Sequence, residues 1–251
     1  MKRIVPFCAA AAVLSVSGLV SGCAYNDTLG RNQLILASPG GLEQQSEAAW
    51  QQLLQTQNPA RTGATVDRIR RVGDRLVQAA GLSNQGWDYA VFNSSSPNAF
   101  VLPSGKISVT TSLLALVQND DQLATVIGHE MGHVVARHAA ERASSTALTN
   151  LGLQVAQGVA GSRGESVGSL GAIAAQYGLL LPYSRRDELE ADRLGVDYMN
   201  AAGFRPSQAV ALWRLMAQQR QSGQPEFAST HPSDSTRINA LEAYIGERGW
   251  S

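Results

Sequence analysis

Apolar residues recur at helical spacing through most of the chain, and this periodicity predicts a mostly helical fold. The clearest case is the segment 64–80, whose apolar residues fall on one helix face: Val66, Ile69, Val72, Leu76 and Val77. The same spacing predicts helices at about 42–56, 119–143, 185–201 and 207–221, and a tail, 228–245, that starts as a loop and ends as a helix. Ser184, with Asp187 in the first turn, is a plausible start for the helix 185–201. Asn119 or Asp120 can cap the helix 119–143.

Two short segments alternate like strands instead. The segment 87–92 reads WDYAVF, and 98–111 reads as a hairpin whose two arms flank the turn signal PSG. The fold class expected from these patterns is therefore α+β, with a small sheet or hairpin beside a set of helices.

The N-terminus has the order of a secretory signal. Lys2 and Arg3 precede a short apolar run that ends in VSGC at Cys23. Small residues before a cysteine resemble the bacterial lipobox, so Cys23 is the expected lipidation site. Ala24 stands where an aspartate tends to retain lipoproteins at the inner membrane, and the location expected is therefore the periplasmic face of the bacterial outer membrane.

These features divide the chain into three parts. Residues 1–22 are expected to be a lipoprotein signal peptide, 23–41 a lipidated tether, and 42–251 a single domain. The composition fits a globular domain, because 44% of the 251 residues are hydrophobic and 16% are charged. Basic and acidic residues balance at 20 each, so no basic surface indicates a nucleic-acid partner.

The segment 144–182 is rich in glycine, alanine and serine. Two weakly polar helical stretches flank a loop in the middle of this segment. They are expected to form either a buried helical pair or a lid over a site, and the sequence leaves both possibilities open.

Three of the four histidines lie in HEMGHVVARH, residues 129–138. His129 and His133 are four residues apart on a helix, so both can bind one ion, while Glu130 lies beside the ion as a general base. This HExxH pattern predicts one Zn²⁺ per chain. His138 is five residues after His133, out of phase with a shared ion, and is expected to face solvent or the helix end.

A catalytic zinc needs a third protein ligand and an open position for water. Glu188 and Asp192 share a helix face, so Glu188 is the candidate ligand, and Asp192 can accept the second N–H of a ligand histidine. Glu190 points elsewhere. The alternative is a solvated acidic face paired with nearby arginines.

Three further positions are weaker candidates. His231 and Arg237 can stabilise the transition state; His231 can instead be a fourth, inhibitory zinc ligand or a packing residue, and Arg237 a surface ion pair. The segment Asn98, Ala99 and Phe100 can bind substrate by strand addition, although Asn98 also fits turn chemistry.

The motifs VIGHEMGHVVARH, SRRDELEAD and THPSDSTRI together resemble the zinc metallopeptidase family that includes the CAAX prenyl protease and the heat-shock protease HtpX. The resemblance covers about 64–245 and is strongest to the periplasmic BepA-like members. It implies a zincin-like domain, with His129, His133 and Glu188 as zinc ligands, Glu130 as the catalytic residue and Asp192 as support.

The function expected is a zinc endopeptidase that degrades unfolded or misassembled envelope proteins, attached to the membrane through its N-terminal lipid. A chaperone or assembly factor for outer-membrane proteins, using the same groove with little proteolysis, is the alternative. A zinc hydrolase of a non-protein bond, such as one in the cell wall, also stays open.

Overall fold

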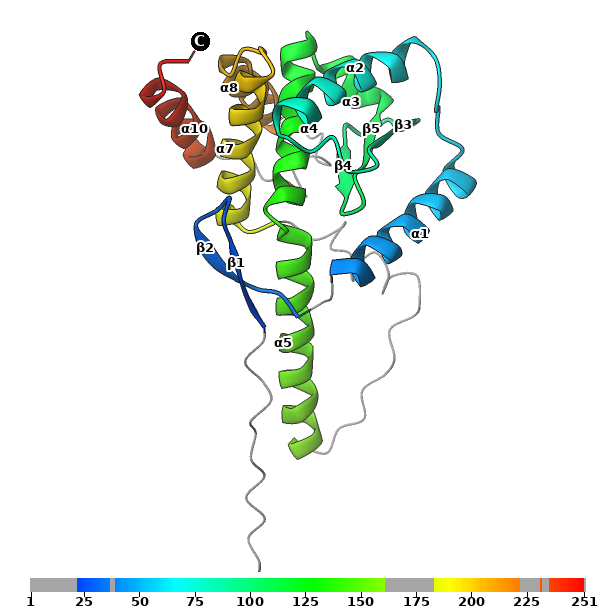
Figure 1. Cartoon of the computed structure of the whole chain (residues 1–251), viewed down its shortest axis with the longest axis vertical. Helices are drawn as coiled ribbons and strands as arrows, with labels where there is room; N and C mark the ends of the chain where they lie inside the picture. Colours follow the sequence, from blue (N-terminus) through cyan, green and yellow to red (C-terminus); the bar gives the residue numbers. More distant parts are fainter. Residues whose placement is uncertain (1–21, 37–38, 161–182, 222–230, 232–234, 251) are drawn as a thin grey trace, which may run out of the picture.

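The helix that carries HEMGH runs through the middle of the molecule. It is α4 (Asp120–Val135) in a computed structural model that describes residues 22–36, 39–160, 183–221, 231 and 235–250. Every residue from Gln122 to His133 is buried, because this helix packs between other helices and the small sheet (Figure 1). Asn119 caps the helix, as predicted: its side chain accepts a hydrogen bond from the backbone N–H of Gln122.

The predicted mostly helical α+β fold is confirmed. The other described helices are α1 (Pro39–Gln57), α2 (Ala64–Ala79), α3 (Thr111–Leu116), α5 (His138–Ala160), α7 (Arg185–Ala201), α8 (Ser207–Gln221) and α10 (Ser235–Glu247). Ser184 begins α7 with a capping box that it shares with Asp187, again as predicted. None of the described helices combines the length and apolarity that crossing a membrane requires.

A three-stranded sheet lies beside α4. Its strands are β3 (Asp88–Phe92), β4 (Ala99–Leu102) and β5 (Lys106–Thr110), in the order β3-β5-β4. The predicted hairpin is the antiparallel pair β4–β5, while β3 pairs with β5 in parallel. Strand β4 is therefore an edge strand of this sheet, and it also packs against α4.

The main core fills the space between α4 and its neighbours. Ile69 and Leu76 of α2, Ile127 and Met131 of α4, and Trp213 of α8 are all buried there. A smaller apolar cluster, built around Trp50 and Phe92, packs α1 against the sheet. The main core therefore fixes α4 relative to the strands and to the helices that follow it, while the smaller cluster fixes α1 on the sheet.

Helices α4 and α7 approach each other so closely that their contact requires glycine. A Cβ atom built on Gly128 would lie 3.0 Å from the carbonyl oxygen of Gly195, and one built on Gly132 would lie 2.8 Å from that of Ala191. A Cβ atom on Gly195 would lie 2.9 Å from the backbone nitrogen of His129. The two backbones therefore touch along the stretch that carries the candidate ligands.

Residues 23–41, expected to be a tether, contain folded elements instead. Strands β1 (Cys23–Asn26) and β2 (Arg31–Leu34) form an antiparallel hairpin, and α1 begins at Pro39. Asn26 and Gln33 of this hairpin are buried, so their contacts with the rest of the domain hold it in place. Cys23 is exposed at the start of β1, and its lipidation stays a prediction.

The single helix expected over 119–143 is two helices. Helix α4 ends at Val135 and α5 begins at His138, because Arg137 takes the left-handed conformation with φ = 54°. The segment 144–160 continues α5, whereas 161–182, the rest of the proposed lid or helical pair, lies outside the described residues, as do residues 1–21 of the expected signal peptide 1–22.

Replacing Gly195 with alanine is expected to force α4 and α7 apart. Overpacking of this kind costs about 1–3 kcal/mol of folding free energy, so the melting temperature and the bound zinc should both fall. Gly246→Ala is the control, because that helical glycine has nothing within 4 Å of its missing Cβ. Thermal unfolding and zinc content measure the two effects. If Gly195→Ala matches the control in both, the close contact is not required.

Candidate metal centre

The two histidines of HExxH point at each other across one turn of α4. The Nε2 atoms of His129 and His133 lie 3.1 Å apart, and both side chains are buried. Helical spacing accounts for this placement, because residues i and i+4 stack on one face.

The predicted third ligand, Glu188, faces them from α7. Its carboxylate oxygens lie 3.4 Å from Nε2 of His129 and 3.5 Å from Nε2 of His133. His231 approaches from the other side, with Nδ1 3.1 Å from Glu188 and 3.2 Å from His129. One ligand atom from each of these four residues lies within 4.8 Å of the others. Imidazole and carboxylate groups at this separation match the ligand set of zinc.

Hydrogen bonds on the far side of each ring prepare these nitrogens for a metal. Nδ1 of His129 lies 2.9 Å from Asp192, an obligate acceptor, so this nitrogen carries the proton. Nδ1 of His133 lies 2.9 Å from Nδ1 of His138. When Nδ1 holds the proton of each neutral ring, the two Nε2 lone pairs converge, which a bound cation favours.

Arg237 lies behind this layer and is fully buried at 1% exposure. It donates two hydrogen bonds to Asp192, at 2.8 Å and 2.7 Å, and its Nη1 lies 2.6 Å from Glu188. The predicted support role of Asp192 is therefore matched by its position. Arg237 faces carboxylates rather than the open side of the centre, so this geometry favours a positioning role over contact with substrate.

The pKa values follow these contacts. Burial would lower the pKa of His129, but hydrogen bonds to Asp192 and Glu188 raise it to about 9. Burial would raise the pKa of Glu188, but His231 and the two other histidines hold it well below its ordinary value. The pKa of His133 is lowered, mainly by burial. Glu188 is therefore ionised and His133 neutral, as metal ligands must be.

Glu130 lies beside the ligand cluster rather than in it. Its Oε1 atom is buried, has no hydrogen-bond partner among the described residues, and lies 3.3 Å from Nε2 of His231. Burial raises the pKa of this carboxyl group. A carboxylate with a raised pKa, facing the ligand atoms, has the properties of a general base that takes a proton from water and later returns it.

His138 was expected to lie out of phase with the shared ion and to face solvent or the helix end; it does lie outside the ligand cluster, but it does not face solvent. His138 is buried, and its two ring nitrogens contact His133 and Glu190. The reason is the break at Arg137, which resets the helical phase between the two histidines. Glu190 points away from the ligand cluster, as predicted, but toward His138 rather than solvent.

Two aromatic residues at the centre were missed by the sequence reasoning. Tyr183 stacks on His133 with ring centroids 3.9 Å apart, and Trp213 packs edge-on against His129 at 5.3 Å. Both rings limit the rotation of a ligand imidazole. Tyr183 could have been found from the sequence, because it directly precedes the cap of α7, the helix that carries Glu188. Trp213 resembled an ordinary core residue.

Of the three proposed substrate residues, Ala99 and Phe100 begin β4 and Asn98 directly precedes it. The side chain of Asn98 accepts a hydrogen bond from the backbone N–H of Ala99, which is the turn chemistry that was the alternative for this residue. Phe100 packs on the Trp50 cluster, away from the ligand atoms, and the side chain of Ala99 is buried. Any substrate contact by this segment therefore involves its backbone.

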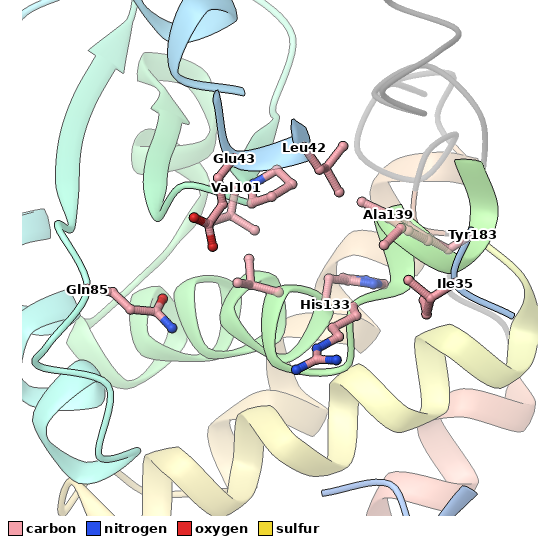
Figure 2. A pocket seen from close by; sticks show the side chains of 12 residues that line it. Ile35, Leu42, Glu43, Gln85, Val101, His133, Ala139 and Tyr183 are labelled. Carbon is pink, nitrogen blue, oxygen red and sulfur yellow. The ribbon is translucent and has the colours of Figure 1, made fainter. Parts of the chain in front are cut away.

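A pocket of about 200 Å³ adjoins His133. Figure 2 shows Leu42 and Glu43 of α1 and Val101 of β4 facing His133 of α4 across it. Most of the lining is apolar: Ile35, Leu42, Val101, Pro103, Val134, Ala139, Ala140 and Tyr183. An apolar side chain of a bound peptide fits this pocket next to a zinc ligand.

A buried HExxH pair completed by a glutamate from a second helix, with a carboxylate base alongside, defines a zinc metalloendopeptidase. The chain belongs to peptidase family M48, which matches residues 64–245. It is 40% identical over 181 residues to the mitochondrial metalloendopeptidase OMA1 of Schizosaccharomyces pombe, across 71% of this chain and 52% of that protein. It is 32% identical over 216 residues to OMA1 of Saccharomyces cerevisiae, across 79% of this chain and 61% of that one.

The β-barrel assembly-enhancing protease of Escherichia coli is 29% identical over 178 residues, across 68% of this chain and 37% of that protein. The predicted family is therefore confirmed, and the chain spans less than two thirds of the length of each of these relatives. The predicted localisation at the periplasmic face of the bacterial outer membrane is wrong by this comparison. The two mitochondrial enzymes are more similar to the chain than the bacterial protease is.

Zinc affinity is expected to rise with pH. His129 must lose its proton to bind zinc, and its pKa of about 9 means that protons compete with the metal at all lower pH values. The affinity should rise about tenfold per pH unit between pH 6 and 8, where one proton is displaced. Competition with a chelator at several pH values measures the slope. A flat profile would show that His129 is already neutral in the apo-protein.

His231→Ala tests the fourth position. His231 lies among the ligand atoms, so its removal should leave three protein ligands and an open position, and casein hydrolysis should rise several-fold. Steady-state rates at saturating zinc measure this. A fall in kcat instead would assign His231 to transition-state stabilisation.

Proposed function

We propose that this zinc metalloendopeptidase cleaves extended, unfolded segments of other proteins. The observation that carries the proposal is the outer edge of β4 beside Glu130, an edge left open in the sense that no other described strand pairs with it. The backbone N–H of Thr110 donates to the carbonyl of Asn98 across β4–β5, at 2.9 Å. Because bonding alternates along an antiparallel pair, the backbone groups of Ala99 and Val101 point to the open edge.

This edge lies next to the general base. A backbone hydrogen bond from Val101 acts on the Glu130 carboxylate and lowers its pKa against the larger effect of burial. A substrate strand added along β4 would then bring its carbonyl groups to the ligand cluster through backbone bonds, with little demand on sequence. Folded proteins rarely offer a free extended strand, so unfolded chains are the substrates that suit this geometry.

The remaining specificity comes from the pocket beside His133. Its apolar lining favours a substrate with a hydrophobic side chain near the cleaved bond, and such side chains become accessible when a protein unfolds. Zinc, when bound, supplies Lewis acidity to the reaction. Glu130 moves the proton, and β4 and the pocket orient the peptide. The name of the E. coli relative, which links it to β-barrel assembly, fits a protease that acts on incompletely folded proteins.

One protein in two states gives the direct test. A disulfide-bonded protein is offered before and after reduction, together with casein, to the parent and to Glu130→Gln. The parent should cleave casein and the reduced form, and leave the oxidised form intact. Glu130→Gln should lose at least about 100-fold in rate, since general base catalysis is worth that much, while retaining zinc.

Each result has a distinct meaning. Equal cleavage of the oxidised and reduced forms would contradict the preference for unfolded segments. Normal cleavage by Glu130→Gln would show that another group is the base. Zinc content measured on both proteins separates a lost base from a lost metal.

A further inference from the structure

The β1–β2 hairpin is attached to the end of the ligand helix. The side-chain amide of Gln33 donates to the carbonyl of Ala136 at 2.6 Å, and that of Asn26 donates to the carbonyl of Val135 at 3.4 Å. The last carbonyl groups of a helix lack partners within the helix, so the hairpin satisfies groups that α4 leaves open.

Arg31, the first residue of β2, binds two carboxylates at once. It makes a two-pronged contact with Glu190 of α7, at 2.7 Å and 2.8 Å, and another with Glu141 of α5, at 3.0 Å and 2.9 Å. Its side chain is 19% exposed. Paired charge-assisted hydrogen bonds of this kind fix orientation as well as adding energy. Three separate elements of the fold therefore meet at this guanidinium.

Glu190 passes this constraint to a zinc ligand through one intermediate. Its Oε2 atom lies 2.9 Å from Nε2 of His138, and Nδ1 of His138 lies 2.9 Å from Nδ1 of His133. Because a carboxylate accepts, Nε2 of His138 is the donor toward Glu190, which leaves its Nδ1 as the acceptor for Nδ1–H of His133. The proton of His133 is then on Nδ1, and its Nε2 lone pair faces the metal centre.

His138 and Glu190, together with Asp187, also have the residue types of a second metal site. Their partners argue against that reading. Glu190 already contacts both Arg31 and His138, while Asp187 forms the capping box of α7 and lies 4.0 Å from His138. Arginines already neutralise both carboxylates, Arg31 that of Glu190 and Arg186 that of Asp187, which leaves little reason for a cation.

We propose that the β1–β2 hairpin is a positioning element of the zinc centre and that Arg31 is its key residue. Arg31 holds Glu190, Glu190 fixes the tautomer of His138, and His138 fixes the tautomer and ring orientation of the ligand His133. The proposal concerns metal binding and is independent of which protein the enzyme cleaves.

The test replaces Arg31 in the full chain and reads zinc affinity by chelator competition. Arg31→Ala should weaken zinc binding by about tenfold or more, the usual effect of removing a partner that orients a ligand. At saturating zinc, kcat should fall while KM for casein stays within about twofold, because β4 and the pocket are untouched. Arg214→Ala is the matched control, since Arg214 makes an exposed ion pair with Glu242 away from the centre.

A double substitution distinguishes the proposed route from general destabilisation. If Arg31 acts through His138, Arg31→Ala and His138→Gln together should weaken zinc binding by no more than the larger single effect. Additive losses would overturn the route, and a lower melting temperature with parental zinc affinity would reduce Arg31 to a structural contact. If Arg31→Ala does not fold, Glu190→Gln interrupts the same chain with nearly unchanged shape, and the same expectations apply.

Discussion

The contact between α4 and α7 is the constraint on which the site depends. In this structure the ligands of the two helices meet where the helix backbones come closer than ordinary side chains allow. Gly128 and Gly132 on one helix and Gly195 on the other remove the Cβ atoms that would keep them apart. Glu188 and Asp192 then reach the histidines, and Arg237 holds both carboxylates in place.

The same closeness creates an electrostatic problem. Three carboxylates, those of Glu130, Glu188 and Asp192, lie in the interior, where an unpaired charge is costly. Arg237 forms ion pairs with two of them, Glu188 and Asp192. Its guanidinium also lies 4.7 Å from the centre of the Trp213 ring. Glu130 is left without such a partner, and the raised pKa that follows is the property a general base needs. Glu188 and Asp192 are thus structural anions that Arg237 stabilises, whereas Glu130 is the carboxylate that reacts.

Local signals in the sequence predicted much of this arrangement. The caps at Asn119 and Ser184, the HExxH pair and Glu188 all depend on contacts within a few residues or on helical phase, which a sequence displays directly. The site residues that the sequence misjudged depend on tertiary contacts. The role of His138 required knowledge that Arg137 breaks the helix, and the burial of Arg237 required knowledge of how α10 docks.

The N-terminal hairpin shows the same limit. Residues 23–41 are polar, and polar segments without periodicity resemble linkers. Their order comes from partners far along the chain, since Gln33 contacts Ala136 and Arg31 contacts Glu190. No pattern within the segment itself encodes those contacts.

Arg237 lies on α10, the last described helix, yet it completes a centre whose first histidines are on α4. A ribosome therefore delivers the metal-binding helix well before the group that balances its charge. A chain synthesised only as far as α8 holds HEMGH without the arginine that contacts Glu188 and Asp192, so the charge of these carboxylates is balanced only after α10 has been made and has docked.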